Sequence, residues 1–320
     1  MHTSRFATWI LLALATALAA LSAPLAMAAS FPDKPITMFI GFNPGGAVDT
    51  TGRVIADKMS KILGQPVVAV TKSGGGGTVM AAQLINAPAD GYTIGMGASA
   101  AYTLTPQINK DITFKIDDFT HLATLTYPSD AIVVKADSPW KTLDDMIQSV
   151  KKSGRPLSFA SQVSASRLMV MAITEKSGVE FKVIPVKGGA VGIQELLGGH
   201  IDSTWSGSGW TEQVRAGKLR ALATMSPERM KDYPDIPTLL ELGYNFSFVD
   251  TFMLSAPKGV PADAVAKLSA AIKQAINDPE VQKILHDKLK LLTKYRDAKE
   301  TLAFLKKQYA DVEPLVKKLK

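Results

Sequence analysis

The sequence of 320 residues contains no cysteine and only four histidines. Without cysteine there is no disulfide, thiolate nucleophile, iron–sulfur cluster, cysteine-ligated zinc or lipid anchor on cysteine. Three histidines lie beyond the N-terminal segment, at His121, His200 and His286, and they form no HxxxH or HExxH spacing. We therefore expect neither a metal site nor a cofactor.

Long apolar runs are also missing after the N-terminal segment. No later stretch reaches the 18 or so uncharged apolar residues that indicate a transmembrane helix. The chain is 46% hydrophobic and 20% charged, and its 24 Gly and 18 Pro follow no repeat, which excludes a disordered or collagen-like protein. The length suggests about two domains of roughly 150 residues each.

The N-terminus has the pattern of an export signal over residues 1–28. Arg5 precedes the uncharged, Leu/Ala-rich run Trp9–Leu21, and Ala26-Met27-Ala28 supplies a small-x-small cleavage site. We therefore expect a periplasmic mature protein without a nucleic-acid partner. The formal net charge of +7 is then explained largely by C-terminal lysines with the spacing of a solvated helix face.

The first part of the mature chain alternates strand, loop and helix, which predicts a parallel sheet with helices on both faces. Gly64 is a good stop for the first helix, because glycine readily adopts the left-handed conformation that ends a helix. The expected elements are strands at Pro35–Phe42, Pro66–Thr71 and Tyr92–Met96, and helices at about Asp49–Leu63 and Thr78–Asn86.

A second α/β set begins near Ala123. Its expected strands are Ala131–Val134, Leu157–Ala160, Lys182–Val186, Ser203–Ser206 and Ala221–Thr224, and its expected helices are Leu143–Lys152, Arg167–Lys176 and Val191–Leu197. A further strand, Phe248–Ala256, follows, and we expect the remainder to be helical, over Pro261–Asn277, Pro279–Lys288 and Ala298–Lys317.

The last block is too helical to form a third domain, so we expect Phe248–Ala256 to return to the first sheet. The chain then crosses twice between two α/β lobes, with a ligand cleft between them. Lobe one comprises residues 29–126 and 249–320, and lobe two residues 127–248. Ligands of open α/β sheets bind outside the carboxyl ends of the strands, where both lobes direct loops into the cleft.

One strand-to-helix loop, Asn43–Asp49, has the chemistry of an anion site. Gly45 and Gly46 allow a ligand close to the backbone, and the following helix offers unpaired N–H groups and the positive end of its dipole. A carboxylate or phosphate would suit it, with Asp49 capping the helix. A purely structural turn is the alternative.

Three more loops have similar chemistry: Gly74–Thr78, Ala98–Ala101 and Ser161–Ser166. Loops of both lobes would grip an anion as a clamp that excludes water and strengthens each hydrogen bond. The candidate ligand-binding residues are Phe42, Asn43, Gly45, Gly46, Ala47, Asp49, Gly75, Gly76, Ser99, Tyr102, Tyr127, Ser161, Ser164, Ala165, Ser166, Lys187, Gly188, Trp205 and Asp250. Tyr102, Tyr127, Trp205 and Trp210 could wall a ligand, with core packing as the alternative.

Catalytic motifs are weak. The nucleophile-elbow GxSxG, the P-loop and the GxGxxG turn are all absent. An exported serine hydrolase stays an alternative, using Ser161, Ser166 or Ser208 with His121 or His200 as the base. A ligand sensor that docks onto a membrane signalling protein is another.

An ordered set of motifs resembles the solute receptors of tripartite tricarboxylate transporters, also called the Bug family, over essentially residues 30–320. The motifs are Phe31-Pro32-Asp33-Lys34-Pro35-Ile36, Pro44-Gly45-Gly46 with Asp49 and Arg53, Leu63–Val68, Gly74–Gly77, Pro88–Thr93, Lys187-Gly188, Leu196–Asp202, Arg215–Ala223 and Pro234–Thr238.

This resemblance implies a non-enzymatic periplasmic receptor of the two-lobed, type II Venus-flytrap fold, a monomer that hands small carboxylates to a membrane permease. It implies that Phe42–Asp49 and Gly74–Gly77 hold the carboxylate, and that Ser161–Ser166 and the turn at Lys187-Gly188-Gly189 contact it from lobe two. The sequence departs from the family pattern at Val163, Ala165, Met169 and Val186, in the lobe that reads the far end of the ligand.

Overall fold

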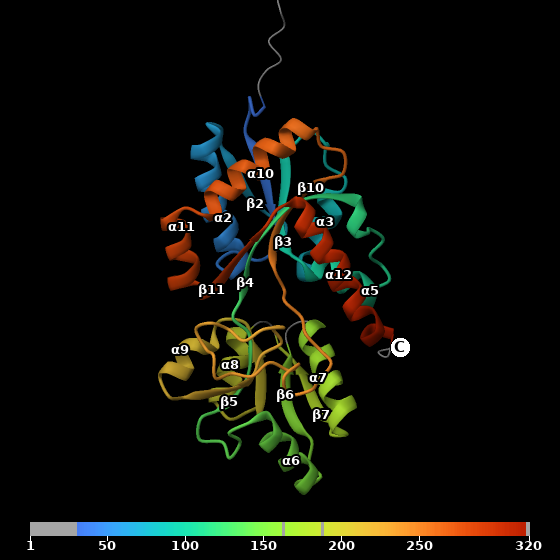
Figure 1. The fold of residues 1–320 in the computed structure, drawn as a ribbon, viewed down its shortest axis with the longest axis vertical. Helices are drawn as coiled ribbons and strands as arrows, with labels where there is room; N and C mark the ends of the chain where they lie inside the picture. Colours follow the sequence, from blue (N-terminus) through green and yellow to red (C-terminus); the bar gives the residue numbers. More distant parts are fainter. Residues whose placement is uncertain (1–30, 162–163, 187–188, 318–320) are drawn as a thin grey trace, which may run out of the picture.

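The structure, a computed structural model, describes residues 31–161, 164–186 and 189–317. The expected signal segment, residues 1–28, and the candidate ligand residues Lys187 and Gly188 lie outside this description. Figure 1 shows two α/β lobes placed end to end, each built around its own sheet. We use lobe one for the six-stranded sheet with its helices and lobe two for the five-stranded sheet with its helices.

The sheet of lobe one has the strand order β11-β4-β10-β3-β1-β2. Its strands are β1 (Ile36–Ile40), β2 (Val67–Thr71), β3 (Thr93–Ala98), β4 (Phe119–Pro128), β10 (Phe252–Pro257) and β11 (Leu291–Arg296). Helices α2 (Ala47–Leu63) and α10 (Ala262–Ile276) pack on one face, and α3 (Thr78–Leu84) and α12 (Ala298–Lys317) pack on the other. The short helices are α4 (Ala100–Thr103), α5 (Thr105–Ile108) and α11 (Pro279–Lys283).

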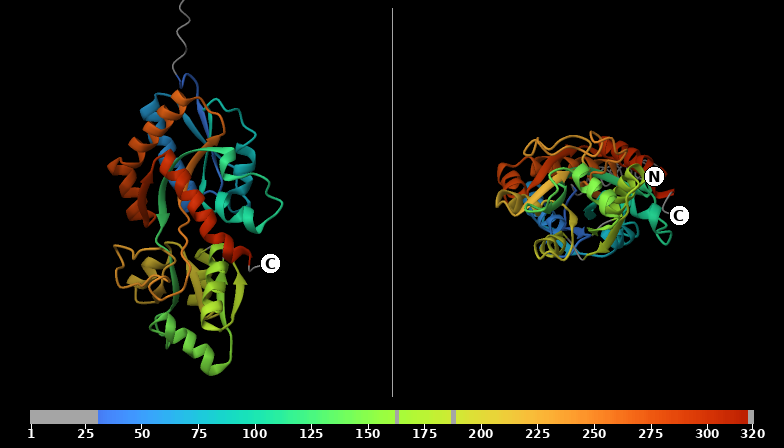
Figure 2. Two further views of the ribbon diagram at one scale, coloured as in Figure 1. Left: turned by 45° about the vertical axis from the view of Figure 1, so that its right-hand side comes forward. Right: turned by 90° about the horizontal axis from the view of Figure 1, so that it is seen from below.

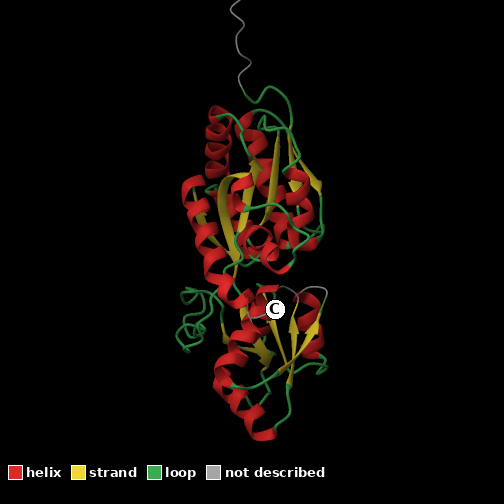
Figure 3. Cartoon of the chain, turned by 90° about the vertical axis from the view of Figure 1, so that its right-hand side faces the viewer, coloured by secondary structure: helices red, strands yellow, loops and turns green. Residues whose placement is uncertain are grey.

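The sheet of lobe two has the order β7-β6-β8-β5-β9. Its strands are β5 (Ala131–Lys135), β6 (Leu157–Ser161), β7 (Phe181–Pro185), β8 (Ser203–Ser206) and β9 (Leu219–Ala223). Helices α6 (Leu143–Ser153) and α7 (Ser164–Ser177) cover one face, and α8 (Gly189–Leu197) and α9 (Trp210–Arg215) cover the other. Figure 3 shows the same layering, with helices on either side of the strands in each lobe.

Local sequence signals explain several of these elements. Helix α2 ends at Gly64, which has a φ of 68° and donates its N–H to the carbonyl of Ser60, as expected of a glycine stop. Helix α6 begins at a capping box, in which Thr142 accepts from the amide of Asp145 and the Asp145 carboxylate accepts from the amide of Thr142.

The return of the chain to the first sheet is confirmed. Strand β10 lies between β3 and β4 and pairs antiparallel with both. The expectation that the remainder is helical is wrong at Leu291–Arg296, because β11 pairs with β4 there. As an edge strand with exposed Thr293 and Lys294, β11 has little of the apolar pattern that identifies a buried strand.

Two crossovers connect the lobes. The first runs from Pro128, where β4 still pairs with β11, through Ser129 and Asp130 into β5. The second runs from Phe248 to Thr251 and enters β10. Helix α12 also reaches from lobe one toward lobe two (Figure 2), where Val312 and Val316 join the core cluster that contains α7.

Candidate functional site

The parallel strands of each sheet, β1 to β4 in lobe one and β6 to β8 in lobe two, have their carboxyl ends on the side of the crossovers. In lobe one, β10 is antiparallel to β3 and to β4, so β4 runs parallel to β3 and β1, and it leaves the sheet at Pro128. In lobe two, β8 is antiparallel to β5, which enters at Ala131, and β6 and β7 run parallel with β8. The strand-to-helix loops of the two lobes therefore lie at facing edges, which we call the first rim and the second rim (Figure 1).

The loop Asn43–Asp49 on the first rim is fixed by one carboxylate. Helix α2 begins at Ala47 with Gly46 as its N-cap, two residues before the expected start, so Asp49 lies inside the first turn instead of at the cap. Its carboxylate accepts from the amide of Gly45 at 3.0 Å and pairs with Arg53 at 2.9 Å. Burial acts to raise the pKa of Asp49, but the hydrogen bonds from Arg53 and Gly45 outweigh it and the pKa is lowered.

The first turn of α2 presents unpaired donors. Gly46 provides no side-chain cap, and within the described residues no acceptor is bonded to the amides of Ala47, Val48 and Asp49. The loop ahead of the helix is exposed at Asn43–Gly46. These amides therefore form a donor group at the positive end of a 17-residue helix, which favours an anion.

The loop Gly74–Gly77 lies beside Gly41 and Phe42, which lead into the first loop. All four glycines have positive φ, between 57° and 135°, which other residues rarely adopt. A Cβ added at Gly41 would come within 3.1 Å of the Gly77 Cα, and one at Gly77 within 3.3 Å of the Phe42 ring. The close approach of the two loops therefore depends on the missing side chains, and the exposed backbone of Gly75 and Gly76 extends the first rim.

Ser99 and Asp250 lie where the second crossover reaches the first rim. The Asp250 carboxylate accepts from the amide of Ala100 at 2.9 Å and from the Ser99 hydroxyl at 3.3 Å. The Ser99 hydroxyl also accepts from the amide of Thr251, so this fully buried side chain holds the crossover. Burial raises the pKa of Asp250 to about 6, against the opposing effect of the two hydrogen bonds.

The second rim carries the serines expected there. Helix α7 begins at Ser164, three residues before its expected start. The hydroxyls of Ser161 and Ser166 lie 2.8 Å apart and are buried, while Ser164 is partly exposed. Ser164 and Ser166 lie in the first turn of α7, as expected, whereas Ser161 is the last residue of β6 and its hydroxyl contacts that of Ser166.

A small cavity lies between the two crossovers, and we call it the floor. Its volume is about 10 Å³, room for roughly one water molecule. It brings together three candidate residues, Ala165, Trp205 and Asp250, with Asp130, which the sequence reasoning missed. The lining residues are Pro128, Asp130, Ala165, Trp205, Met225, Phe248, Val249 and Asp250.

Asp130 is buried and bound to lobe two by three donors. It accepts from the Thr224 hydroxyl, the Trp205 indole N–H and the Met225 amide, each at 3.0 Å. Burial raises its pKa, and these hydrogen bonds oppose the change. In the sequence, Asp130 stands out only as a charged residue just before the apolar run Ala131–Val134.

Core packing accounts for two of the aromatic residues proposed as ligand walls. Tyr102 is 1% exposed and packs edge-on against Phe119 and His121, inside lobe one. Trp210 is fully buried and donates its indole N–H to the carbonyl of Ser129. Tyr127 is partly buried in β4, opposite Leu292. Of the four aromatic residues, Trp205 alone lines the floor.

The structure does not assemble the serine–histidine pair of the hydrolase alternative. The two ring nitrogens of His121 contact the Ser255 hydroxyl and the carbonyl of Ile116, each at 2.9 Å, in the core of lobe one. Burial lowers the pKa of His121 to about 4. Ser208 donates to the carbonyl of Lys290, and His200 is an exposed residue of the turn after α8.

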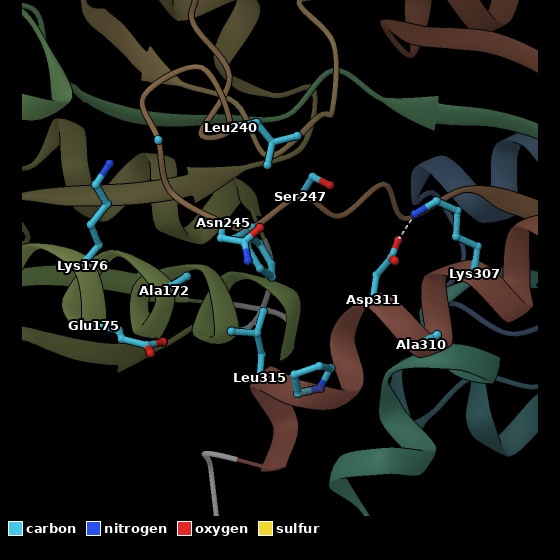
Figure 4. A pocket seen from close by; sticks show the side chains of 13 residues that line it. Ala172, Glu175, Lys176, Leu240, Asn245, Ser247, Lys307, Ala310, Asp311 and Leu315 are labelled. Carbon is cyan, nitrogen blue, oxygen red and sulfur yellow. Dashed lines mark hydrogen bonds and ion pairs between the residues drawn. The ribbon is translucent and has the colours of Figure 1, made fainter.

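A separate groove of about 750 Å³ lies between α7, the loop around residues 240–247 and α12 (Figure 4). None of the candidate ligand residues that the structure describes lines it. Its charged groups already have partners, because Lys307 pairs with Asp311 at 2.6 Å and Lys176 donates to the carbonyl of Leu242 at 2.9 Å. Both lysines in the described lining of this α7–α12 groove are therefore already engaged by the protein itself.

Within residues 31–161, 164–186 and 189–317, no group of three or more His, Cys, Asp or Glu is placed to hold a metal ion. Over the same ranges, no helix is both long and apolar enough to cross a bilayer.

Comparisons with known sequences agree on one family. Residues 51–320 match the family described as tripartite tricarboxylate transporter family receptor. A Cupriavidus necator protein named UPF0065 protein in gbd 5'region is 37% identical over 298 residues, which cover 91% of this chain and 90% of that protein. Protein BugT of Bordetella pertussis is 30% identical over 273 residues, covering 83% of each.

Solved structures confirm the expected two-lobed fold. The TctC solute binding protein from Polaromonas, solved without ligand, is 29% identical, with a TM-score of 0.76 over 90% of this chain and 99% of that one. MatC from Rhodopseudomonas palustris, solved with bound malate, is 26% identical, with a TM-score of 0.75 over 89% of this chain and 100% of that one.

Proposed function

The chain belongs to the tripartite tricarboxylate transporter receptor family, and from that premise we propose that it is a periplasmic receptor that binds one small organic carboxylate between its lobes and delivers it to a membrane permease of the tripartite type. Its residues 1–28 would direct export, and the mature protein would act as a monomer without catalysing a reaction.

The unpaired amides at the start of α2 carry this proposal. An anion at a helix N-terminus is favoured by about 0.3–1 kcal/mol at an exposed position and by up to ~2 kcal/mol when partly buried. Asp49 leaves this position open because its charge is already paired with Arg53 and its carboxylate accepts from Gly45. The glycine loop Gly74–Gly77 adds exposed backbone beside it.

In this proposal the second rim contacts the ligand from lobe two. In this proposal lobe one comprises residues 29–126 and 249–320, lobe two comprises residues 127–248, and a hinge at the crossovers brings the rims together. Ser164 would then reach the ligand from the start of α7, and closing would exclude water and strengthen the hydrogen bonds. The bound malate of MatC supports a carboxylate as the ligand class.

The experiment is a thermal-shift and calorimetry screen of the mature protein against a broad panel of mono- and dicarboxylates. A true ligand at about 100 times its Kd should add about 2.7 kcal/mol to the free energy of unfolding. If no carboxylate in the panel raises the melting temperature, the proposal is wrong.

Gly46→Val tests the location of the site. Gly46 has a φ of −76° and a ψ of 167°, and an added Cβ there has only the carbonyl oxygen of Asn43 nearby, at 3.4 Å. The backbone therefore accepts valine, and folding should be nearly unchanged, while the side chain crowds the donors of α2 and weakens binding at least tenfold. Gly46→Ala is the matched control with a smaller effect. Unchanged affinity in Gly46→Val would place the carboxylate elsewhere.

A further inference from the structure

The floor between the crossovers has a chemistry unlike that of the rims. Among the residues that the structure describes, its lining contains two carboxylates, Asp130 and Asp250, and no Lys, Arg or His. Its remaining residues offer mainly apolar surface, contributed by Trp205, Met225 and Phe248 among others. The rims thus present amide and hydroxyl donors, whereas the floor presents acceptors.

The two aspartates differ in what their oxygens already do. Both oxygens of Asp130 are occupied, Oδ1 by Thr224 and Oδ2 by Trp205 and Met225. In Asp250, both donors bind Oδ1, and no hydrogen bond reaches Oδ2 from the described residues. Asp250 therefore retains an acceptor oxygen on the partly buried side chain that lines the floor.

We propose that Asp250 selects the end of the ligand remote from its bound carboxylate, and that this end carries a hydroxyl or ammonium donor and not a second carboxylate. This inference rests on the proposed function, because it needs a carboxylate held at the first rim.

Size and charge both support this assignment. A floor of about 10 Å³ has room for one group the size of a water molecule, such as a hydroxyl or an ammonium, and a carboxylate is larger. A second carboxylate would also face two acids with no cation in the described lining to offset their charge, whereas a donor would satisfy Oδ2. A hydrogen bond to a charged acceptor of this kind corresponds to roughly a tenfold to hundredfold difference in affinity.

The test is calorimetry of the whole mature protein with acids matched in chain length. The probes are butyrate, γ-hydroxybutyrate, γ-aminobutyrate and succinate, together with their homologues one carbon shorter and one carbon longer. At about pH 7.5, where Asp250 is ionised, the donor-bearing acids should bind about tenfold or more tightly than the unsubstituted and dicarboxylic acids of the same length.

Asp250→Asn should reverse this order. Asparagine keeps an oxygen for Ala100 and Ser99 and places an NH₂ donor where Oδ2 was, so the dicarboxylate gains and the ammonium acid loses affinity. Asp137→Asn is the matched control, because Asp137 is an exposed residue of lobe two that pairs with Lys135. It should leave the order unchanged.

The unmodified protein provides a second readout in case the variant folds poorly. Asp250 has a pKa of about 6, and the other titratable side chain of the floor, Asp130, also has a raised pKa. At about pH 5 Asp250 is protonated and can donate, so the advantage of the ammonium acid over the dicarboxylate should shrink.

The outcomes separate the two proposals. Tighter binding of dicarboxylates at neutral pH, with the same order in Asp250→Asn, overturns the assignment of Asp250 and leaves the carboxylate receptor standing. A donor preference that the variant does not alter also overturns it. Failure of every acid to bind overturns the receptor function itself.

Discussion

Asp130 ties the first crossover to lobe two, and replacing it with alanine should destabilise the protein. The substitution leaves the indole N–H of Trp205 and the amide of Met225 without an acceptor in a buried site, while the Thr224 hydroxyl can turn to another partner. Each buried unsatisfied N–H costs about 1–3 kcal/mol. Burial raises the pKa of Asp130, so keeping its carboxylate charged inside the protein costs free energy. Alanine avoids that cost, which offsets part of the loss from the two unsatisfied N–H groups. We expect a net loss of about 3 kcal/mol.

Asp130→Asn is the matched comparison. Its amide oxygen can accept from both Trp205 and Met225, and its NH₂ can donate to the Thr224 hydroxyl oxygen, so every hydrogen bond has a counterpart. The asparagine variant should therefore lie within about 1 kcal/mol of the unmodified protein. Urea unfolding, followed by tryptophan fluorescence and by circular dichroism, measures the free energies of both variants.

A double-mutant cycle isolates one of these hydrogen bonds. In a Trp205→Phe background the indole N–H is already absent, so Asp130→Ala should cost about 1 kcal/mol less than in the unmodified protein. If Asp130→Ala is as stable as Asp130→Asn, or if the cycle shows no coupling, the reasoning about this crossover is refuted.

Two further substitutions test other contacts. Asp49→Ala should lower the free energy of unfolding by about 1 kcal/mol, because the Gly45 amide loses its acceptor and Arg53 its partner. It should also weaken carboxylate binding. Urea unfolding that gives equal stability for both proteins would contradict this. Hydrogen bonds from His286 to Asp287 and to Asp232 of the other lobe raise the pKa of His286. The stabilisation from these contacts is therefore complete below pH 6.5 and is lost as the pH rises through the folded-state pKa. Asp232→Asn should flatten this part of the stability–pH profile, and superimposable profiles would count against the cross-lobe contact.

Much of the fold could be predicted because its parallel strands carry strong local signals. Residues Pro35–Phe42 are nearly all apolar, and Gly64 marks the end of the following helix, so β1 and α2 emerge from pattern alone. The return of β10 to the first sheet could be predicted because the C-terminal helices need a sheet against which to bury their apolar faces. Strand β11 was missed because an edge strand needs only one apolar face, and half of its residues are polar or charged.

The site could be predicted only as far as the backbone determines it. The loops Asn43–Asp49 and Gly74–Gly77 were identifiable because glycines before a helix have a direct physical meaning. The floor was not, because Asp130 and Asp250 are far apart in sequence and meet only when both crossovers are in place. Tyr102 shows the reverse case, because it lies in α4 just after β3 and yet belongs to the core.

The central claim is that main-chain amides at the start of α2 hold the carboxylate. Nuclear magnetic resonance of the ¹⁵N-labelled mature protein, titrated with the tightest acid from the screen, measures this directly. We predict the largest downfield amide shifts at Ala47 and Val48, accompanied by Gly75 and Gly76. Saturable binding that leaves these amides unmoved and shifts residues of the α7–α12 groove would contradict the account.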